Sequence, residues 1–188
     1  MIKTSQLDSN FKYEIANEPG GENIKRCFNC TGCTVGCPVT EIDKGYNPRK
    51  IIRKALLGMR DEVLSDDSIW LCASCYLCYE RCPQDVKITE VMGAIRAIAQ
   101  REAKAGNIKL DNPKPLFDNL FINSVRKNGK WHEAGVSGMF TLKTKGIKGL
   151  IDYIPMGLEL FRKGKVSILP HKIKGKDQIK RIFEEVER

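Results

Sequence analysis

The chain has 188 residues and a net charge of +9, and 41% of its residues are hydrophobic. This length and composition are typical of a soluble protein with one domain, or with a small domain and extensions. No apolar run reaches the roughly 18 residues that suggest a transmembrane helix, and the first residues, MIKTSQ, lack the apolar stretch of a signal peptide. We therefore expect neither a membrane span nor export.

The charge is unevenly distributed along the chain. Residues 1–100 carry 13 basic and 13 acidic side chains, whereas residues 101–188 carry 19 basic and 10 acidic ones. A basic face can bind nucleic acid, anionic lipid or an acidic protein, or it can simply face solvent. The basic half contains no nucleic-acid-binding module and no interleaved aromatic residues, so we favour a protein partner and expect no nucleic acid.

The first 24 residues are expected to form an N-terminal arm. Residues 11–15, with the sequence FKYEI, alternate weakly between apolar and polar side chains, which favours a short strand. Pro19 and the two glycines that follow it would end this strand before the first cysteine.

The eight cysteines of the chain lie in two copies of one spacing. The first copy contains Cys27, Cys30, Cys33 and Cys37, and the second contains Cys72, Cys75, Cys78 and Cys82. Both copies have the form C-x2-C-x2-C-x3-C-P, the run that holds 4Fe–4S clusters in bacterial ferredoxins. Outside the cysteines and prolines the copies share little sequence. We therefore expect two 4Fe–4S clusters as cofactors.

The spacing also predicts which cysteines belong together. A 4Fe–4S cube takes one thiolate on each of its four irons, and in two-cluster ferredoxins the cysteine before the proline binds the other cluster. The predicted ligands of the first cluster are Cys27, Cys30, Cys33 and Cys82, and those of the second are Cys72, Cys75, Cys78 and Cys37. Pro38 and Pro83 fix their own φ and would turn the chain just after the crossing cysteines.

Two other uses of cysteine fit this pattern less well. Zinc is usually bound by two separate pairs of cysteines, not by four cysteines within 11 residues. Disulfides suit small secreted chains, and no signal peptide is expected here. Because thiols stay reduced in the cytoplasm, the iron–sulfur interpretation implies a cytoplasmic location.

Helices are predicted beside both cysteine runs. Asn47 is a suitable N-cap followed by Pro48, and the apolar residues behind them share one helical face: Ile51, Ile52, Ala55, Leu56 and Met59. Residues 66–68 can cap a second helix that leads into the second run. Thr89 can cap a third helix that ends at Gly106. The predicted fold class is mainly α, with an α-helical ferredoxin-like core over residues 25–110.

Residues 111–188 are expected to form a basic helical extension that docks on other subunits. A helix is predicted from Leu116 to about Asn128, and Pro155 should kink or split another one over residues 147–161. Residues 169–175 are predicted to be a loop. A last helix is predicted from Asp177, as its cap, to Val186. Residues 130–146 are rich in glycine and predict no element.

No catalytic residue is predicted. The chain contains no glycine-rich loop for dinucleotides or phosphates and no nucleophile elbow. His132 and His171 lack partner residues for catalysis and are expected to be structural or exposed. Trp70 is expected to pack in the core beside a cluster. These observations predict a carrier of electrons without a substrate site of its own.

Four further segments accompany the cysteine runs, namely residues 45–49, 69–72, 86–89 and 169–175. With them, most of the chain resembles the C subunit of the soluble heterodisulfide reductase of methanogenic archaea. The resemblance implies that the eight cysteines are cluster ligands. It also implies electron transfer in methanogenesis, from a flavin-bearing A subunit that bifurcates electrons to a B subunit that reduces the heterodisulfide of coenzyme M and coenzyme B.

The same resemblance implies an indirect association with a nickel–iron hydrogenase or a formate dehydrogenase. The C-C-G motifs of the disulfide-reducing site in that family do not occur here, so this reaction is expected on another chain. An alternative is the iron–sulfur subunit of a succinate or fumarate oxidoreductase, although the 2Fe–2S motif of such chains, C-x4-C-x2-C…C, is absent. A free ferredoxin-like carrier is another alternative, but such carriers are more often small and acidic.

Overall fold

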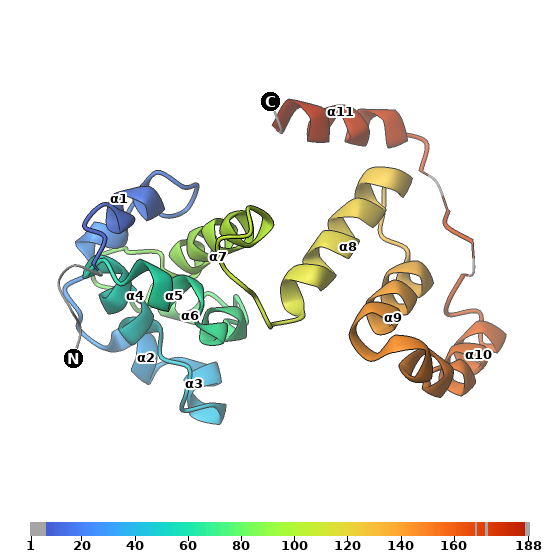
Figure 1. Ribbon diagram of the computed structural model, residues 1–188, viewed down its shortest axis with the longest axis horizontal. Helices are drawn as coiled ribbons and strands as arrows, with labels where there is room; N and C mark the ends of the chain where they lie inside the picture. The colour runs from blue at the N-terminus through green and yellow to red at the C-terminus, as the bar shows by residue number, and fades with distance from the viewer. Residues whose placement is uncertain (1–6, 168, 172, 187–188) are drawn as a thin grey trace. The chain divides into compact units, whose positions relative to one another are not determined.

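The computed structural model describes residues 7–167, 169–171 and 173–186, and every regular element in these ranges is a helix (Figure 1). The prediction of a mainly helical protein is therefore confirmed. None of the described helices is long and apolar enough to cross a lipid bilayer. The chain divides into two compact units, the first extending to Asn112 and the second starting at Pro113.

The first unit is built from short helices around one longer helix. Its elements are α1 (Phe11–Ala16), η2 (Ile24–Arg26), α2 (Gly32–Val35), α3 (Pro38–Ile42), α4 (Pro48–Leu56), α5 (Arg60–Leu64), η3 (Asp67–Leu71), α6 (Leu77–Glu80) and α7 (Ile88–Lys104), where η marks a 3-10 helix. The helices α1, α5, α6 and η3 all pack against α7. Helix α7 is therefore the central support of this unit.

Apolar side chains from these helices form one buried core. On α7, the completely buried residues Val91, Met92, Ile95 and Ile98 recur at helical spacing, so that one broad face of the helix is apolar. The other helices contribute Phe11, Ile15, Ile24, Ile52, Val63, Leu64 and Ile69 to the same core. Removing such surface from water contributes roughly 25 cal/mol per Å², which makes this core the main stabilising feature of the unit.

Residues 11–16 form helix α1, so the prediction of a strand at this place is wrong. Phe11 and Ile15 are completely buried, but Tyr13 between them is half exposed. In a strand all three side chains would lie on the same face, because alternate residues point to the same side. In a helix only residues three or four apart share a face, which matches the observed burial.

The predicted helix behind Asn47 is confirmed as α4. The Asn47 side chain accepts a hydrogen bond from the backbone N–H of Lys50 at 2.9 Å, and Pro48 occupies the first turn, where its missing N–H is not needed. The helix ends before Met59 because Gly58 adopts a φ of +79°. A Cβ atom at this glycine would also collide with the backbone of Asp8.

The other two predicted helix starts differ in outcome. Asp66 caps its element as predicted, since its carboxylate accepts a hydrogen bond from the N–H of Ser68 at 2.9 Å, although the element is a short 3-10 helix. Thr89 does not cap α7, because the helix starts at Ile88, directly after Lys87 with its φ of +58°. Thr89 is instead buried inside the first turn of the helix.

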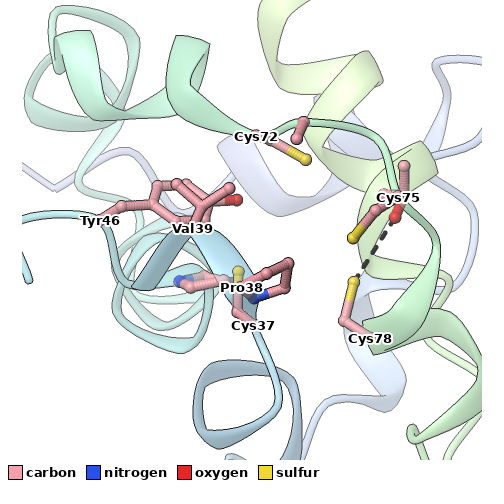
Figure 2. Close-up of a pocket in the computed structure, with 10 residues that line it drawn as sticks. Cys37, Pro38, Val39, Tyr46, Cys72, Cys75 and Cys78 are labelled. Carbon is pink, nitrogen blue, oxygen red and sulfur yellow. Dashed lines mark hydrogen bonds between the residues drawn. The ribbon is translucent and has the colours of Figure 1, made fainter. Parts of the chain in front are cut away.

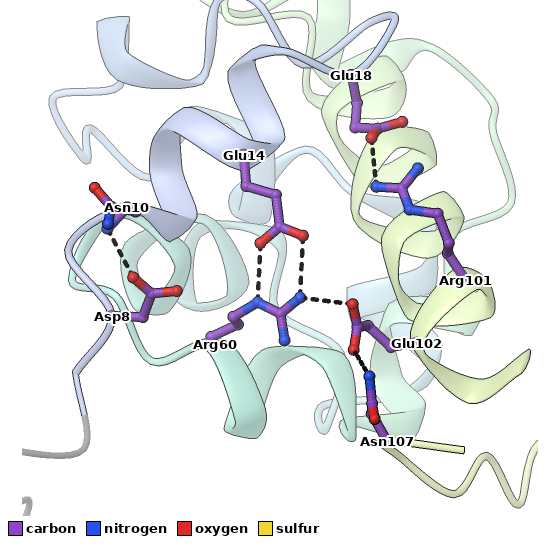
Figure 3. A network of polar contacts seen from close by, with 8 residues as sticks. All are labelled: Asp8, Asn10, Glu14, Glu18, Arg60, Arg101, Glu102 and Asn107. Atoms are coloured by element: carbon purple, nitrogen blue, oxygen red, sulfur yellow. Dashed lines mark hydrogen bonds and ion pairs between the residues drawn. The ribbon is translucent and has the colours of Figure 1, made fainter. Parts of the chain in front are cut away.

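An ion-pair network joins α1 to α5 and α7 (Figure 3). The Nε and Nη2 atoms of Arg60 donate to the two carboxylate oxygens of Glu14 at 2.9 and 3.0 Å, and Nη2 also lies 3.0 Å from a carboxylate oxygen of Glu102. Arg101 pairs with Glu18 nearby. These contacts attach the N-terminal helix to elements that lie far along the chain.

The second unit contains four helices among its described residues, namely α8 (Lys114–Asn128), α9 (Glu133–Asp152), α10 (Ile154–Arg162) and α11 (Lys176–Val186). Helices α9 and α11 pack against α8, and α10 packs against α9. The rings of Phe117 and Phe121 on α8 contact Trp131, and Phe117 also contacts Phe140 on α9. These aromatic contacts attach α9 to α8.

Most boundaries in the second unit agree with the sequence. Helix α8 ends before Gly129, whose φ is +81°, and the chain breaks between α9 and α10 at Tyr153, shortly before Pro155. No helix or strand was predicted for residues 130–146, but most of them belong to α9. This helix contains one residue with non-helical φ and ψ, Gly146. The last helix starts one residue before Asp177, so this residue lies in its first turn.

The predicted loop over residues 169–175 is irregular wherever the structure describes it, and residue 172 lies outside the described residues. His132 precedes α9, and its Nδ1 accepts a hydrogen bond from the N–H of Gly135 at 3.1 Å. Its Nε2 lies 2.9 Å from the carbonyl oxygen of Ser167. His132 therefore holds the start of a helix, and His171 is exposed.

Candidate metal centre

Both cysteine runs have the same backbone course, although they share little sequence. Each run contains two residues with a positive φ, and they occupy equivalent positions. These residues are Asn29 and Thr31 in the first run and Ser74 and Tyr76 in the second, with φ between +52° and +75°. Left-handed backbone is uncommon outside glycine, so its recurrence indicates that both runs need the same curvature. Alternation of left- and right-handed residues turns successive N–H groups to one side, as in many anion and iron–sulfur sites.

The third cysteine of each run lies on a four-residue helix, Cys33 on α2 and Cys78 on α6. These two helices pack against each other. Gly36, the residue before Cys37, lies so close to Arg81 that a Cβ atom would overlap the arginine side chain. The two runs are therefore in direct contact at the positions that precede their last cysteines.

The last cysteine of the first run joins the second run. Cys37 is extended, with φ of −87° and ψ of 119°, and Pro38 directly after it starts α3. Its side chain lines one pocket together with Cys72, Cys75 and Cys78 (Figure 2). These are the four cysteines that the sequence assigns to one cluster, and their role as ligands remains a prediction.

This pocket, which we call the Cys37 pocket, suits a sulfur-bound iron centre. It has a volume of about 300 Å³, part of it open to solvent. The wall besides the cysteines is formed by Pro38, Val39, Tyr46, Pro48, Ala73 and Thr89. Thiolates are the ligands of iron–sulfur clusters, whereas hard cations such as magnesium and calcium prefer oxygen. The donor set of the pocket therefore fits a 4Fe–4S cluster.

In the part of the chain that the structure describes, no three His, Cys, Asp or Glu side chains converge on one point as the ligands of a single metal ion do. A cubane is bound in a different way, because each cysteine binds a different iron atom. The four thiolates of such a site surround a space, and they do not share one metal ion.

The last cysteine of the second run, Cys82, is the counterpart of Cys37. Its sulfur accepts a hydrogen bond from the backbone N–H of Val86 at 3.4 Å. Burial raises the pKa of the Cys27 thiol, and Cys82 is one of the neighbouring sulfur atoms that act in the same direction. The place of Cys82 in the first cysteine set remains a prediction.

Burial raises the pKa of three cysteine thiols. The pKa of Cys33 rises to about 11, and those of Cys27 and Cys78 are raised as well, with neighbouring sulfur atoms acting in the same direction. All eight cysteines, which lie within the described residues, are free of disulfides. Because a metal-bound cysteine must be deprotonated, cluster loading has to displace the protons of these thiols.

A buried hydroxyl group reaches a cysteine of the Cys37 pocket. The Oγ1 atom of Thr89 lies 3.5 Å from the Sγ atom of Cys78, and Figure 2 draws this contact as a dashed line from the Cys78 sulfur. Tyr46 also lines the pocket and is 1% exposed. Neither residue was predicted from the sequence to belong to the site. Both belong to segments that accompany the cysteine runs, but no local signal shows which side chain faces the pocket.

Trp70 packs in the core directly before the second run, as the sequence predicted. The guanidinium of Arg96 lies 5.8 Å from the centre of its ring. The same guanidinium donates hydrogen bonds to the carbonyl oxygens of Ile69 and Cys72 at 2.8 and 2.9 Å. Arg96 therefore fixes the backbone at the point where the second run begins.

A helical unit with two interlocked cysteine runs is typical of proteins that hold cubane iron–sulfur clusters. In agreement with this class, residues 23–86 match the family described as the 4Fe-4S dicluster domain. The matched range contains all eight cysteines and the helices from η2 to α6.

Several relatives identify the family more closely. The iron–sulfur C 2 subunit of the CoB–CoM heterodisulfide reductase of Methanocaldococcus jannaschii is 42% identical over 121 residues, which cover 61% of this chain and 62% of the relative. The C2 subunit of the H2/formate:CoB–CoM heterodisulfide,ferredoxin reductase of Methanococcus maripaludis is 44% identical over 115 residues, covering 57% and 60%.

A longer match is found with the iron–sulfur C subunit of the CoB–CoM heterodisulfide reductase of Methanopyrus kandleri, which is 36% identical over 144 residues, covering 68% of this chain and 73% of the relative. The chain belongs to the family of the heterodisulfide reductase C subunit. It spans about three fifths of the length of the first two relatives.

Proposed function

We propose that this protein is the electron-transfer subunit of a heterodisulfide reductase complex. In this proposal it receives electrons from a flavin-bearing, electron-bifurcating A subunit, and it delivers them to a B subunit that reduces the heterodisulfide of coenzyme M and coenzyme B. The names of the relatives support this role, since they are iron–sulfur or C-type subunits of reductases for that heterodisulfide. The protein itself carries no substrate site in this proposal.

The proposed cofactors are two 4Fe–4S clusters, each held by three cysteines of one run and the last cysteine of the other. The first cluster is held by Cys27, Cys30, Cys33 and Cys82, and the second by Cys72, Cys75, Cys78 and Cys37. The observation that carries this assignment is the presence of Cys37 in one pocket with three cysteines of the second run. When bound, such clusters take up and release single electrons.

The residues around the Cys37 pocket support electron transfer more than bond-making chemistry. Its lining residues include no histidine, carboxylate or amine that could act as a general acid or base near neutral pH. The pocket is partly open to solvent, and Cys75 is exposed. In this proposal the chain holds a redox group, and the chemistry of the heterodisulfide takes place on another subunit.

The proposed location is the cytoplasm, because eight free thiols suit a reducing compartment. The basic second unit is proposed to dock on the other subunits, and its excess of basic over acidic side chains supports an acidic protein partner. An indirect association with a nickel–iron hydrogenase or a formate dehydrogenase is part of the same proposal. The relative from Methanococcus maripaludis, which is named for hydrogen and formate, supports it.

Metal analysis of anaerobically reconstituted protein tests the cofactor assignment. We expect about eight irons and about eight acid-labile sulfides per chain, as two 4Fe–4S clusters require. Cys37→Ser should perturb the cluster of the second run, and the reciprocal variant Cys82→Ser should perturb that of the first run. A sample that binds only zinc, or a Cys37→Ser variant that affects only the cluster of the first run, would contradict the assignment.

An anaerobic pull-down with the whole chain as bait tests the assembly. We expect a flavoprotein and a heterodisulfide-reducing protein to be retained together. If the chain elutes alone from a lysate in which both proteins are present, it is a free carrier and the proposed place in a complex is wrong.

A further inference from the structure

The sulfur atoms of the two cysteine sets have different kinds of hydrogen-bond donors. In the set of the Cys37 pocket, the side-chain hydroxyl of Thr89 lies at the sulfur of Cys78. In the other set, the backbone N–H of Val86 donates to the sulfur of Cys82. The fold itself supplies the backbone donor, whereas the hydroxyl depends on one individual residue.

The proton of the Thr89 hydroxyl is available for the sulfur of Cys78. Thr89 is only 7% exposed, and a buried hydroxyl is normally hydrogen-bonded. The Cys78 sulfur, at 3.5 Å, is the partner that the structure gives it. A cluster-bound thiolate has no proton to donate, so the hydroxyl must be the donor in this pair.

The first set has one hydroxyl nearby, but that hydroxyl cannot serve it. Thr34 Oγ1 lies 4.0 Å from Cys33 Sγ. Its single proton is used in a hydrogen bond to Asn47 Oδ1 at 3.0 Å, and Asn47 Oδ1 can only accept. The oxygen of Thr34 additionally accepts from the backbone N–H of Arg49 at 3.2 Å. Thr34 therefore makes no strong hydrogen bond to the first set.

We propose that Thr89 is a positioning residue that raises the reduction potential of the cluster in the Cys37 pocket. This inference rests on the proposed function, since it requires that pocket to hold a 4Fe–4S cluster. Reduction adds negative charge to a cluster, and a hydrogen bond to a cysteine sulfur stabilises that charge. The cluster of the first set does not depend on this residue.

An anaerobic redox titration of the reconstituted chain, followed by electron paramagnetic resonance, tests this proposal. Thr89→Val should lower the midpoint potential of the pocket cluster only. At a fixed solution potential, we expect the ratio of reduced to oxidised cluster to fall roughly three- to tenfold, and tenfold corresponds to about 59 mV for one electron. Signals are assigned with Cys75→Ser, which marks the pocket cluster, and Cys30→Ser, which marks the other.

Two variants control for loosening of the structure. Thr89→Ser keeps the hydroxyl and should retain the unaltered potential, so a shift as large as that of Thr89→Val would overturn the role of Thr89. Tyr13→Phe removes a phenol on α1 that is half exposed, and it should shift neither potential. If Thr89→Val fails to hold its clusters, Thr89→Ala, which also lacks the hydroxyl, carries the same test.

The outcomes separate this inference from the proposed function. An unchanged potential in Thr89→Val, in protein that contains about eight irons, overturns the inference and leaves the cofactor assignment intact. Equal shifts of both clusters also overturn it, because they indicate a general change in the fold. Unaltered protein without iron–sulfur clusters would overturn the proposed function itself.

Discussion

The first unit buries most of its large apolar side chains, whereas the second unit leaves many of them in contact with solvent. In the first unit α7 alone contributes four completely buried large side chains, but α10 in the second unit contains no buried residue. The exposed apolar residues of α10 are Ile154, Met156, Leu158, Leu160 and Phe161. The first unit is therefore stabilised by its own core, while the second has apolar surface left over, which agrees with its proposed docking role.

A matched pair of isoleucine substitutions should show the largest difference between the units. Ile98 on α7 is 0% exposed and Ile154 on α10 is 58% exposed. Ile98→Ala removes buried surface and leaves a cavity, so the free energy of opening of α7 should fall by about 2–5 kcal/mol. Ile154→Ala should change that of α10 by less than about 0.5 kcal/mol. Hydrogen exchange resolved by segment measures both values, and similar losses in the two helices would contradict the comparison.

A smaller difference is expected for ion pairs. Arg60→Ala leaves the carboxylates of Glu14 and Glu102 without their shared partner, so α1 should open more easily, by about 1–2 kcal/mol. Lys163 on α10 forms an exposed pair with Glu159, and Lys163→Ala should change the stability of α10 by at most about 0.5 kcal/mol. Hydrogen exchange of α1 and α10 provides the measurement. Unchanged protection of α1 in Arg60→Ala would show that the core alone holds this helix.

The smallest effect should appear in the acid stability of the first unit. The pKa of Glu102 is lowered by the hydrogen bond from Asn107 and then by Arg60. A carboxylate with a lowered pKa contributes stability above its unfolded pKa, near 4.5, and this contribution is lost as the pH falls through the folded pKa. Glu102→Gln should therefore show a shallower loss of stability below about pH 5. Urea denaturation at several pH values checks this, and parallel curves for both proteins would rule it out.

Sequence signals that involve neighbouring residues predicted the helices well. Asn47 with Pro48 and Asp66 with Ser68 act within one turn, so their effect does not depend on the rest of the fold. The five residues from Phe11 to Ile15 were too few to distinguish a strand from a helix. The burial or exposure of Tyr13 distinguishes the two, and it depends on tertiary packing. Thr89 has the chemistry of a helix cap, but the left-handed Lys87 starts the helix earlier.

The candidate site, like the helices, was predicted from the sequence only in part. The spacing of the cysteines predicted that Cys37 would lie with the cysteines of the second run, and one pocket contains Cys37 with three of them. The places of Tyr46 and Thr89 in the wall of this pocket could not be predicted, since they depend on how α4 and α7 pack around the loops. The equal curvature of the two runs was also missed, because Asn29 and Ser74, or Thr31 and Tyr76, are chemically unlike.

The crossing of Cys37 and Cys82 between the two runs has a consequence for biosynthesis. A nascent polypeptide that has left the ribosome only as far as Pro38 presents four closely spaced thiols, although one of them faces the later run in the finished protein. The second set of sulfur atoms is complete only when Cys78 has been translated, and the first set only when translation has reached Cys82. Metal loading that waits for this residue would produce the interlocked arrangement directly, whereas premature loading of the first four thiols would have to be reversed by ligand exchange.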